Sequence, residues 1–225
     1  MLFLAVFCGF LAENIREHKA EKEKGKQYIE SFYRDLKKDT ATFSRIIADD
    51  EKKKEVLKDV FNCYDTVRKN WRATSCLIPL VKNSRTNSSL TFSNGTLQQL
   101  KNAGGYRLLN DKDRDSIMSY DNSIQDYKDF ESTVFQESQD IVRVTFSMIS
   151  DFTSNKFLYR TMAGADSSNI EMPLLFSDDK VLLNKYFNDL LRYRVANQSQ
   201  ITQIKIRQEK AMRLIDYFKN KYHLD

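Results

Sequence analysis

KQYIESFYRDLKKDTATFSRIIADDEKKKEVLKDVFNCYDTVRKNW, residues 26–71, decides the fold class of this chain. Its apolar side chains recur at steps of three and four residues, which place them on one stripe of a helix. The spacing predicts one long amphipathic helix of the kind found in coiled coils and helical bundles. One row of the stripe holds Ile29, Leu36, Phe43, Leu57, Tyr64 and Trp71, and the other holds Phe32, Ile46, Val60 and Val67.

Three charged residues, Asp39, Asp50 and Lys53, interrupt this stripe. We expect them to be partly exposed or to lie at a local bend of the helix, and not to form a buried functional cluster.

Two further stripes of the same kind follow, one from about Asp111 to Phe152 and one from about Asp178 to Tyr222. Residues 72–94 contain Pro79 and a Ser/Thr/Asn cluster and are predicted to be a loop. Residues 96–103 are predicted to form a short helix. Each long helix would span about 43 to 46 residues, or roughly 65–70 Å. Helices of matched length can lie antiparallel and bury their stripes together. The sequence therefore predicts an all-α fold, an elongated antiparallel bundle of three long helices plus one short helix over residues 27–225.

The stretch LQQLKNAGGYRLLNDKDRDSI, residues 97–117, contains the pair Gly104-Gly105. The pair follows a helix, and neither GxxxxGK[ST] nor GxGxxG is present, so a phosphate or dinucleotide loop is not indicated. A glycine after the last periodic residue is the usual way to end a helix. We therefore predict a structural corner at Gly104 and Gly105, with Asn110 or Asp111 capping the next helix. A calcium loop at DKDRDS fails, because Ser116 and Asn122 stand where Gly and Glu are needed.

The first residues, MLFLAVFCGFLA (1–12), are wholly apolar, and the charged segment ENIREHKAEKEKGK (13–26) follows at once. Twelve helical residues reach about 18 Å, against roughly 30 Å of hydrocarbon in a bilayer. We interpret residues 1–12 as a truncated N-terminal transmembrane segment and residues 13–26 as a solvated helical stalk. The alternative is an N-terminal helix buried in the bundle or in a dimer seam.

Charge and motifs exclude several functions. The 36 Lys and Arg residues are interspersed with 31 Asp and Glu residues, so no basic stripe for nucleic acid is indicated. No metal-ligand spacing, nucleophile motif or cofactor motif occurs, and we assign no catalytic, cofactor-binding or metal-ligating residue. An enzyme stays an alternative only through an active site built from dispersed residues, such as the carboxylates Asp35 and Asp39 one helical turn apart.

Three cysteines, Cys8, Cys63 and Cys76, are present. The sequence favours free thiols for Cys63 and Cys76, and their pairing would require that the domain faces an oxidising compartment.

The connection between the second and third long helices, residues 154–177, carries apolar side chains. If the first helix leads away from a membrane and the second returns, residues 72–110 are distal and residues 154–177 face the bilayer. These side chains then form a candidate membrane-interface loop; the alternative is that they cap the bundle core. They are Phe157, Leu158, Tyr159, Met172, Leu174, Leu175 and Phe176.

The start of the chain, FLAVFCGFLAENIREHKAEKEKGKQYIESFYRDLKKDT, resembles an uncharacterised family of small bacterial single-pass membrane proteins. In that family an apolar span ends in a FLAEN-x-RE-like junction and continues as a long charged helix. An LK-x-x-GG-x-RL-like segment is matched here by Leu100, Lys101, Gly104, Gly105, Arg107 and Leu108. The resemblance implies a membrane-anchored helical domain on the extracytoplasmic side and no catalytic residues.

From these observations we expect a membrane-anchored helical interaction or sensory module without enzymatic activity. Its expected partners are the lipid bilayer, through the N-terminal segment, and a second protein or further copies of this chain. The alternative from another class is a small-ligand sensor with a pocket between the long helices near Tyr120, Tyr127 or Trp71.

Overall fold

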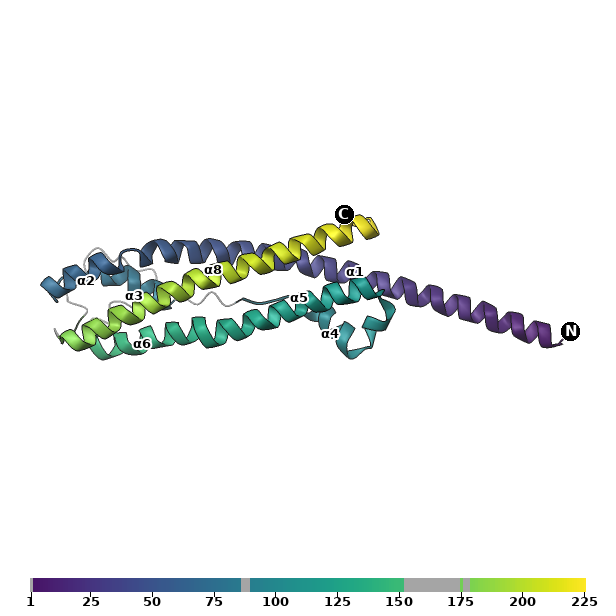
Figure 1. Cartoon of the computed structure of the whole chain (residues 1–225), viewed down its shortest axis with the longest axis horizontal. Coiled ribbons are helices and arrows are strands. Elements are labelled where there is room, and N and C mark those ends of the chain that lie inside the picture. The colour runs from purple at the N-terminus through teal and green to yellow at the C-terminus, as the bar shows by residue number, and fades with distance from the viewer. Residues whose placement is uncertain (1, 86–89, 152–174, 176–178) are drawn as a thin grey trace. The chain divides into compact units, whose positions relative to one another are not determined.

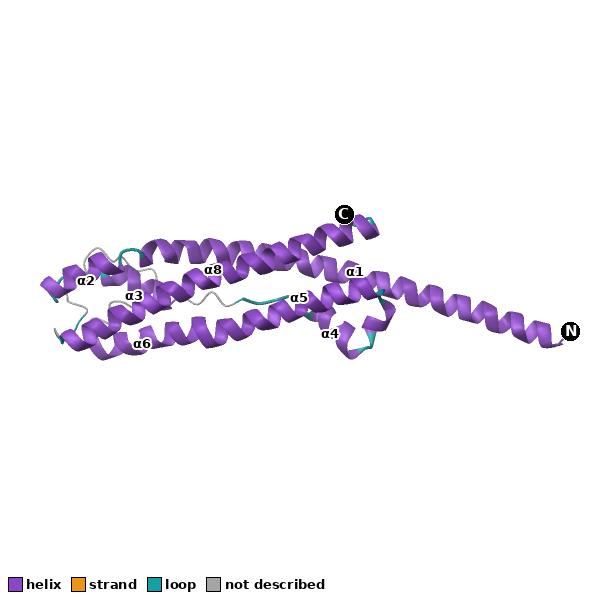
Figure 2. Ribbon diagram, viewed as in Figure 1, coloured by secondary structure: helices purple, strands orange, loops and turns teal. Residues whose placement is uncertain are grey.

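The computed structural model describes residues 2–85, 90–151, 175 and 179–225, and Figure 1 labels the helices in order. Figure 2 shows helices joined by loops; the described residues contain no strand, only an isolated antiparallel bridge between Ser150 and Leu175. The all-α prediction is confirmed. The elements are α1 Leu2–Leu57, α2 Val60–Lys69, α3 Leu77–Arg85, α4 Gly95–Asn102, a 3₁₀ turn Gly105–Leu108, α5 Asp111–Phe130, a π-helix Glu131–Gln136, α6 Glu137–Ile149 and α8 Lys180–Tyr222.

The chain divides into two compact units. Unit 1 contains residues 1–44, 90–126 and 205–225, and unit 2 contains residues 45–89 and 127–204. The long helices α1, α5 and α8 each contribute residues to both units. The sequence predicted one bundle over residues 27–225, and each unit has a core of its own.

The core of unit 1 joins three helices through aromatic rings. Phe32 of α1 meets Tyr120 of α5 edge-on, with ring centroids 5.9 Å apart, and meets Phe218 of α8 at 6.1 Å. All three rings are almost fully buried. Edge-to-face pairs of this kind contribute about 0.5–1.5 kcal/mol each beyond the area that they bury. The stripe that contains Phe32 therefore faces the other two helices, as the spacing predicts.

In unit 1, α1 and α5 run in the same direction, so the predicted antiparallel order of the first two helices is wrong. Gly25 of α1 lies against Leu108, three residues before α5 begins, and Phe32 lies against Tyr120. Residue numbers thus rise together along the two helices. α8 runs opposite to α1, because Phe32 also meets Phe218.

The reason for this order is the path of the long connection before α5. The backbone N–H of Ser93 donates to Asp39, and the Thr96 hydroxyl donates to Asp35. This segment therefore runs antiparallel to α1, toward the N-terminal end of that helix. The 3₁₀ turn that follows reaches Tyr28, beside Gly105. The sequence placed residues 72–110 at the end of the bundle away from the stalk; the corner within them instead packs against Gly25, where the stalk meets the bundle.

One helix lies inside residues 72–94, which the sequence predicted to be a loop. In α3, Leu77, Leu80 and Val81 are buried against the core of unit 2. Pro79 is the third residue of the helix, where a backbone N–H has no partner within the helix, so proline causes no loss there. The loop prediction gave Pro79 too much weight, and the burial of the apolar residues beside it stabilises the helix.

The charged residues that interrupt the first stripe are buried, and the prediction of partial exposure or a bend is wrong. Asp39 is 3% exposed, Asp50 0% and Lys53 3%. Asp50 and Lys53 form an ion pair within unit 2, with 3.0 Å between Lys53 Nζ and Asp50 Oδ1. Burial is tolerated because each charge has a partner at hydrogen-bond distance.

Unit 2 has one continuous apolar core. α6 and α8 pack antiparallel in it, since Phe146 meets Tyr186 at 5.5 Å and Phe135 meets Tyr193 at 5.7 Å between ring centroids. Phe135 lies in the π-helix, whose wider turn shifts the register of the side chains that follow it. The core also receives side chains from the end of α1 and from α2 and α3.

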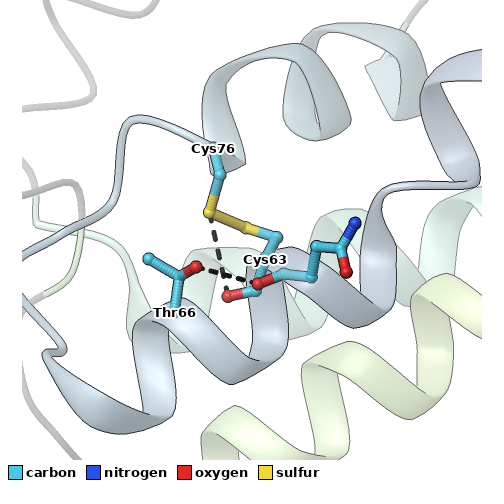
Figure 3. Close-up of a disulfide and its surroundings, with 4 residues drawn as sticks. Cys63, Thr66 and Cys76 are labelled. Carbon is cyan, nitrogen blue, oxygen red and sulfur yellow. Dashed lines mark hydrogen bonds between the residues drawn. A yellow bond between two sulfur atoms is a disulfide. The ribbon is translucent and has the colours of Figure 1, made fainter.

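A disulfide joins Cys63 of α2 to Cys76, the residue before α3 (Figure 3). Their Cα atoms are 5.5 Å apart, in the usual range for a disulfide. The sequence favoured free thiols at these two positions, and that prediction is wrong. The disulfide is the alternative, which the sequence analysis linked to an oxidising compartment. Beside the disulfide, the Thr66 hydroxyl donates to the carbonyl of Asn62 at 2.9 Å, a bond within α2.

The N-terminal part of α1 is helical and uncovered. Its described side chains from Val6 to Lys24 are all exposed, and Gly25 is the first buried residue after Val6. Residues 6–12 are therefore not buried within the bundle, which was one half of the alternative interpretation; burial in a dimer seam, the other half, stays a prediction. None of the described helices combines the length and the apolarity that crossing a bilayer requires, so the predicted truncated transmembrane segment gains no support from them.

Candidate functional site

A cleft in unit 2 between α2 and the start of α8 is the candidate site. Its volume is about 610 Å³, within the range of about 300–1,000 Å³ typical of small-molecule sites. Its floor is apolar, because Val67, Leu183 and Phe187 are all buried members of the unit 2 core. The floor therefore has the rigidity of the core beneath it.

Two aromatic side chains, Tyr64 and Trp71, form the walls of the cleft. Tyr64 packs edge-on against Phe187, with 5.1 Å between ring centroids. Both wall residues are half-buried, so part of each ring faces the opening. Trp71 is the only tryptophan of the chain.

The rim of the cleft is basic. Arg68, Lys69 and Lys180 line it, all three are exposed, and none of the other described residues that line it is acidic. No carboxylate in the described part of the chain forms an ion pair with any of the three. The Arg68 guanidinium lies over the Tyr64 ring at 6.0 Å, which positions one cation above a wall.

Local structure fixes both sides of the cleft. α2 ends at Lys69, and the turn behind it is held by the Arg72 N–H, which donates to the Asn70 side chain at 3.1 Å. Trp71 lies in this turn, inside the loop that the Cys63–Cys76 disulfide closes. On the other side, the Asp179 carboxylate caps α8 by accepting from the N–H groups of its second and third residues, at 2.8 and 3.1 Å.

The sequence named Tyr120, Tyr127 and Trp71 as neighbours of a pocket, and of these only Trp71 lines the cleft. Tyr120 and Tyr127 are fully buried. The Tyr120 hydroxyl donates to Asp39 at 2.9 Å, and Gln200 donates to the Tyr127 hydroxyl at 3.1 Å. Sequence reasoning missed the rim residues, because an exposed Lys or Arg on a helix carries no signal that a cleft lies beside it.

The residues of the predicted corner lie together in unit 1. Gly104 has a φ of 62°, in the left-handed region that glycine adopts without a Cβ penalty, and it follows the end of α4. Gly105 begins the 3₁₀ turn. Asn110 caps α5 through its side-chain oxygen, which accepts from the N–H of Asp113 at 3.1 Å, and Asp111 is the first residue of that helix.

Gly25 is the point of α1 against which this corner packs. A Cβ added to Gly25 would lie 2.5 Å from the Leu108 carbonyl oxygen, which is backbone and cannot turn away. We expect Gly25→Ala to destabilise the contact by about 1–3 kcal/mol, because overpacking outweighs alanine's better helix propensity. The measurement is hydrogen exchange of the backbone amides of residues 105–109, which should exchange faster in the variant.

Gly9→Ala is the matched control, because Gly9 lies in the same helix with nothing within 4 Å of an added Cβ. It should leave the exchange of residues 105–109 unchanged. Equal exchange in the two variants would show that α1 and the corner do not pack as described.

Asp113 ties the start of α5 to the end of α8. Its fully buried carboxylate accepts from Lys221 Nζ at 2.6 Å, from the Tyr217 hydroxyl at 2.7 Å and from Tyr222 and Asn110. Burial raises the pKa of Asp113, but these donors outweigh it and hold the pKa below its ordinary value. Burial, then the hydrogen bond to Asp113 and the charge of Asp113, raise the pKa of Tyr222 to about 12. With these donors in place, the Asp113 carboxylate links the start of α5 to the end of α8.

The carboxylate pair that could have served acid–base chemistry is also engaged in structure. Asp35 accepts from the Thr96 hydroxyl at 2.6 Å, and Asp39 accepts from the Ser93 N–H at 2.8 Å. Burial raises the pKa of Asp39 and outweighs its hydrogen bonds from Ser93 and Tyr120, which lower it. These contacts hold the segment before α4 on α1.

Of the candidate membrane-interface residues, only Leu175 falls in the described part. It is 2% exposed and belongs to the unit 2 core, which fits the alternative that this connection caps the core. The other six, Phe157, Leu158, Tyr159, Met172, Leu174 and Phe176, lie outside the described residues.

No protein-family profile, curated protein or solved structure matches the chain. The resemblance to a family of single-pass membrane proteins, carried by the N-terminal junction and the Gly104-Gly105 segment, therefore stays a prediction.

Proposed function

We propose that this chain is a membrane-attached helical interaction or sensory module, held at a bilayer by the first turns of α1. The units beyond the stalk are free to meet a partner protein or further copies of the chain. The single observation that carries the proposal is a group of exposed apolar side chains on the uncovered start of α1. Their exposed fractions run from 44% to 69%, and they are Val6, Phe7, Phe10, Leu11 and Ile15.

These side chains favour lipid because of what surrounds them. Between Val6 and Lys24 no described side chain is buried, so the apolar group stands apart from both cores. The segment after it alternates in charge, with pairs such as Arg16–Glu13, and continues to Gly25 as one helix. An apolar helix end followed by a charged helix matches an element inserted at a membrane interface.

The disulfide supports the extracytoplasmic side for the units. Disulfides persist in oxidising compartments and are rare in the reducing cytosol. Cys63 is almost fully buried on α2, and its bond to Cys76 closes a structural loop. We therefore infer that unit 2 faces an oxidising compartment.

Vesicle flotation of the full chain tests the attachment. We expect the Phe7→Ser/Phe10→Ser variant to lose roughly tenfold or more of its vesicle-bound fraction, since each buried phenylalanine contributes about 1.5–3 kcal/mol. Because Lys and Glu are interspersed after the apolar group, phosphatidylcholine vesicles should bind nearly as well as anionic ones.

Phe61→Ser is the control, because Phe61 is 57% exposed but lies on α2. It should float like the unaltered chain. Equal flotation of all three proteins would overturn the proposal. Loss of self-association in the double variant, with no flotation of any protein, would assign the apolar group to a second copy of the chain.

A small-ligand sensor is the second candidate function, and the cleft of unit 2 is the observation that favours it. The cleft joins an apolar floor to a few polar groups, the combination that small-molecule sites share. The two candidates are compatible, since attachment uses residues 6–15 and the cleft uses α2 and α8.

A further inference from the structure

We propose that the cleft between α2 and α8 binds a small aromatic carboxylate, or another planar organic anion with an apolar body. The inference rests on the second candidate function and names its ligand class. It does not depend on attachment to a membrane.

The charge of the ligand follows from the rim. Arg68, Lys69 and Lys180 line the same opening, and no described carboxylate pairs with them. Asp179, next to Lys180, directs its carboxylate to the N–H groups at the start of α8. A cleft with low-dielectric walls and one sign of charge raises the local concentration of the opposite charge, here an anion.

The body of the ligand follows from the walls and floor. Tyr64 and Trp71 present ring surface to the opening, and Phe187 and Leu183 lie beneath it. A compact inorganic anion would leave this apolar surface in contact with water, whereas a flat ring would cover it. The volume of about 610 Å³ accommodates one or two rings with a carboxylate.

The position of the charge relative to the ring is set by Arg68. Its guanidinium lies 6.0 Å from the Tyr64 ring, so a carboxylate bound to Arg68 places its own ring beside that wall. The planar fork of the guanidinium matches a carboxylate in a bidentate arrangement. Arg68 is thus the residue expected to orient the ligand, and Lys180 provides a second charge from α8.

Trp71 makes the test direct, because the only tryptophan of the chain is a wall of the cleft. The full chain is titrated with para-tert-butylbenzoate while the Trp71 fluorescence is followed. We expect a saturable change in fluorescence, with a dissociation constant at least roughly tenfold lower than that of the neutral para-tert-butylbenzyl alcohol. Acetate, which carries the charge without the body, should give no saturable change, and added salt should weaken the binding of the benzoate.

Arg68→Gln and Lys180→Gln should each raise the dissociation constant of para-tert-butylbenzoate by roughly tenfold, without altering the binding of the neutral alcohol. Lys82→Gln is the matched control, because Lys82 is exposed on α3 of the same unit and does not line the cleft. Circular dichroism of each variant checks that unit 2 is folded.

Equal affinity for the benzoate and the alcohol, an equal loss in Lys82→Gln, or no saturable change at all would each overturn the inference. These outcomes are separate from flotation, because the titration contains no lipid and the Phe7→Ser/Phe10→Ser variant should bind the benzoate like the unaltered chain. Failure of one proposal is thereby distinguished from failure of the other.

Discussion

Lys53→Met is expected to lower the free energy of unfolding of unit 2 by about 3–5 kcal/mol, the range seen when a buried ion pair loses one partner. The Asp50 side chain is 0% exposed and that of Lys53 is 4% exposed, with 3.0 Å between Lys53 Nζ and Asp50 Oδ1. Methionine fills the space of the lysine stem but leaves the aspartate charge in the core. Urea unfolding followed by Trp71 fluorescence measures the loss, since Trp71 belongs to unit 2.

The neighbouring residue provides the matched control. Lys52 forms an ion pair with Asp49 at the same spacing of three residues, but its side chain is 80% exposed. Lys52→Met should therefore change the free energy of unfolding by less than about 1 kcal/mol. The double variant Asp50→Asn/Lys53→Met should recover at least half of the loss, because it removes both charges.

A loss in Lys53→Met no larger than that in Lys52→Met would show that the Asp50 charge is not held in the core. Tyr193 lies in the same environment, where burial and then the nearby Asp50 raise the pKa of its hydroxyl above its ordinary value. The ion pair also lies beside the π-helix, since Lys53 Nζ is 5.8 Å from the centre of the Phe135 ring. The pair is thus part of the packing between α1 and the π-helix.

The pattern of the stripe was enough to predict a buried ion pair between Asp50 and Lys53. Asp50 and Lys53 occupy two consecutive core positions of the stripe, between Ile46 and Leu57, and they have opposite signs. Two opposite charges three residues apart on one face can pair when that face is buried. For Asp39 no such signal existed, because its donors Ser93 and Tyr120 lie 54 and 81 residues away in the chain.

Periodicity predicted which residues form the long helices but not their directions. The stripes of residues 26–71 and 111–152 are compatible with either a parallel or an antiparallel neighbour, because a stripe records one buried face and no polarity. Ser93 and Thr96 carry the chain back along α1, and that contact is long-range. The break between α1 and α2 at residues 58–59 was also missed, since the stripe continues through it.

The cleft was predictable only in part, through Trp71. Trp71 stands at the end of the first apolar stripe, which made it a candidate pocket residue. In the structure it is half-buried and lines the cleft. Its opposite side comes from Lys180 and Leu183, more than a hundred residues later in the chain. The disulfide that closes the loop around Trp71 was likewise not predictable from the sequence, because the spacing of two cysteines does not give the distance between their Cα atoms.

The Cys63→Ser/Cys76→Ser variant is expected to lower the free energy of unfolding of unit 2 by about 3 kcal/mol. The two cysteines are 13 residues apart, and a cross-link that closes a loop of this length removes about that much entropy from the unfolded chain. Urea unfolding followed by Trp71 fluorescence measures the change. A reducing agent should have the same effect on the unaltered chain and none on the variant.

Cys8→Ser is the control, because Cys8 is exposed in the apolar start of α1 and is not disulfide-bonded. It should unfold like the unaltered chain in both the presence and the absence of the reducing agent. If the reducing agent destabilises the double variant as much as the unaltered chain, its effect does not pass through this disulfide. If the effect is confined to the disulfide, reduction loosens the loop that carries Trp71, and the affinity of the cleft for its ligand then depends on the oxidised state of unit 2.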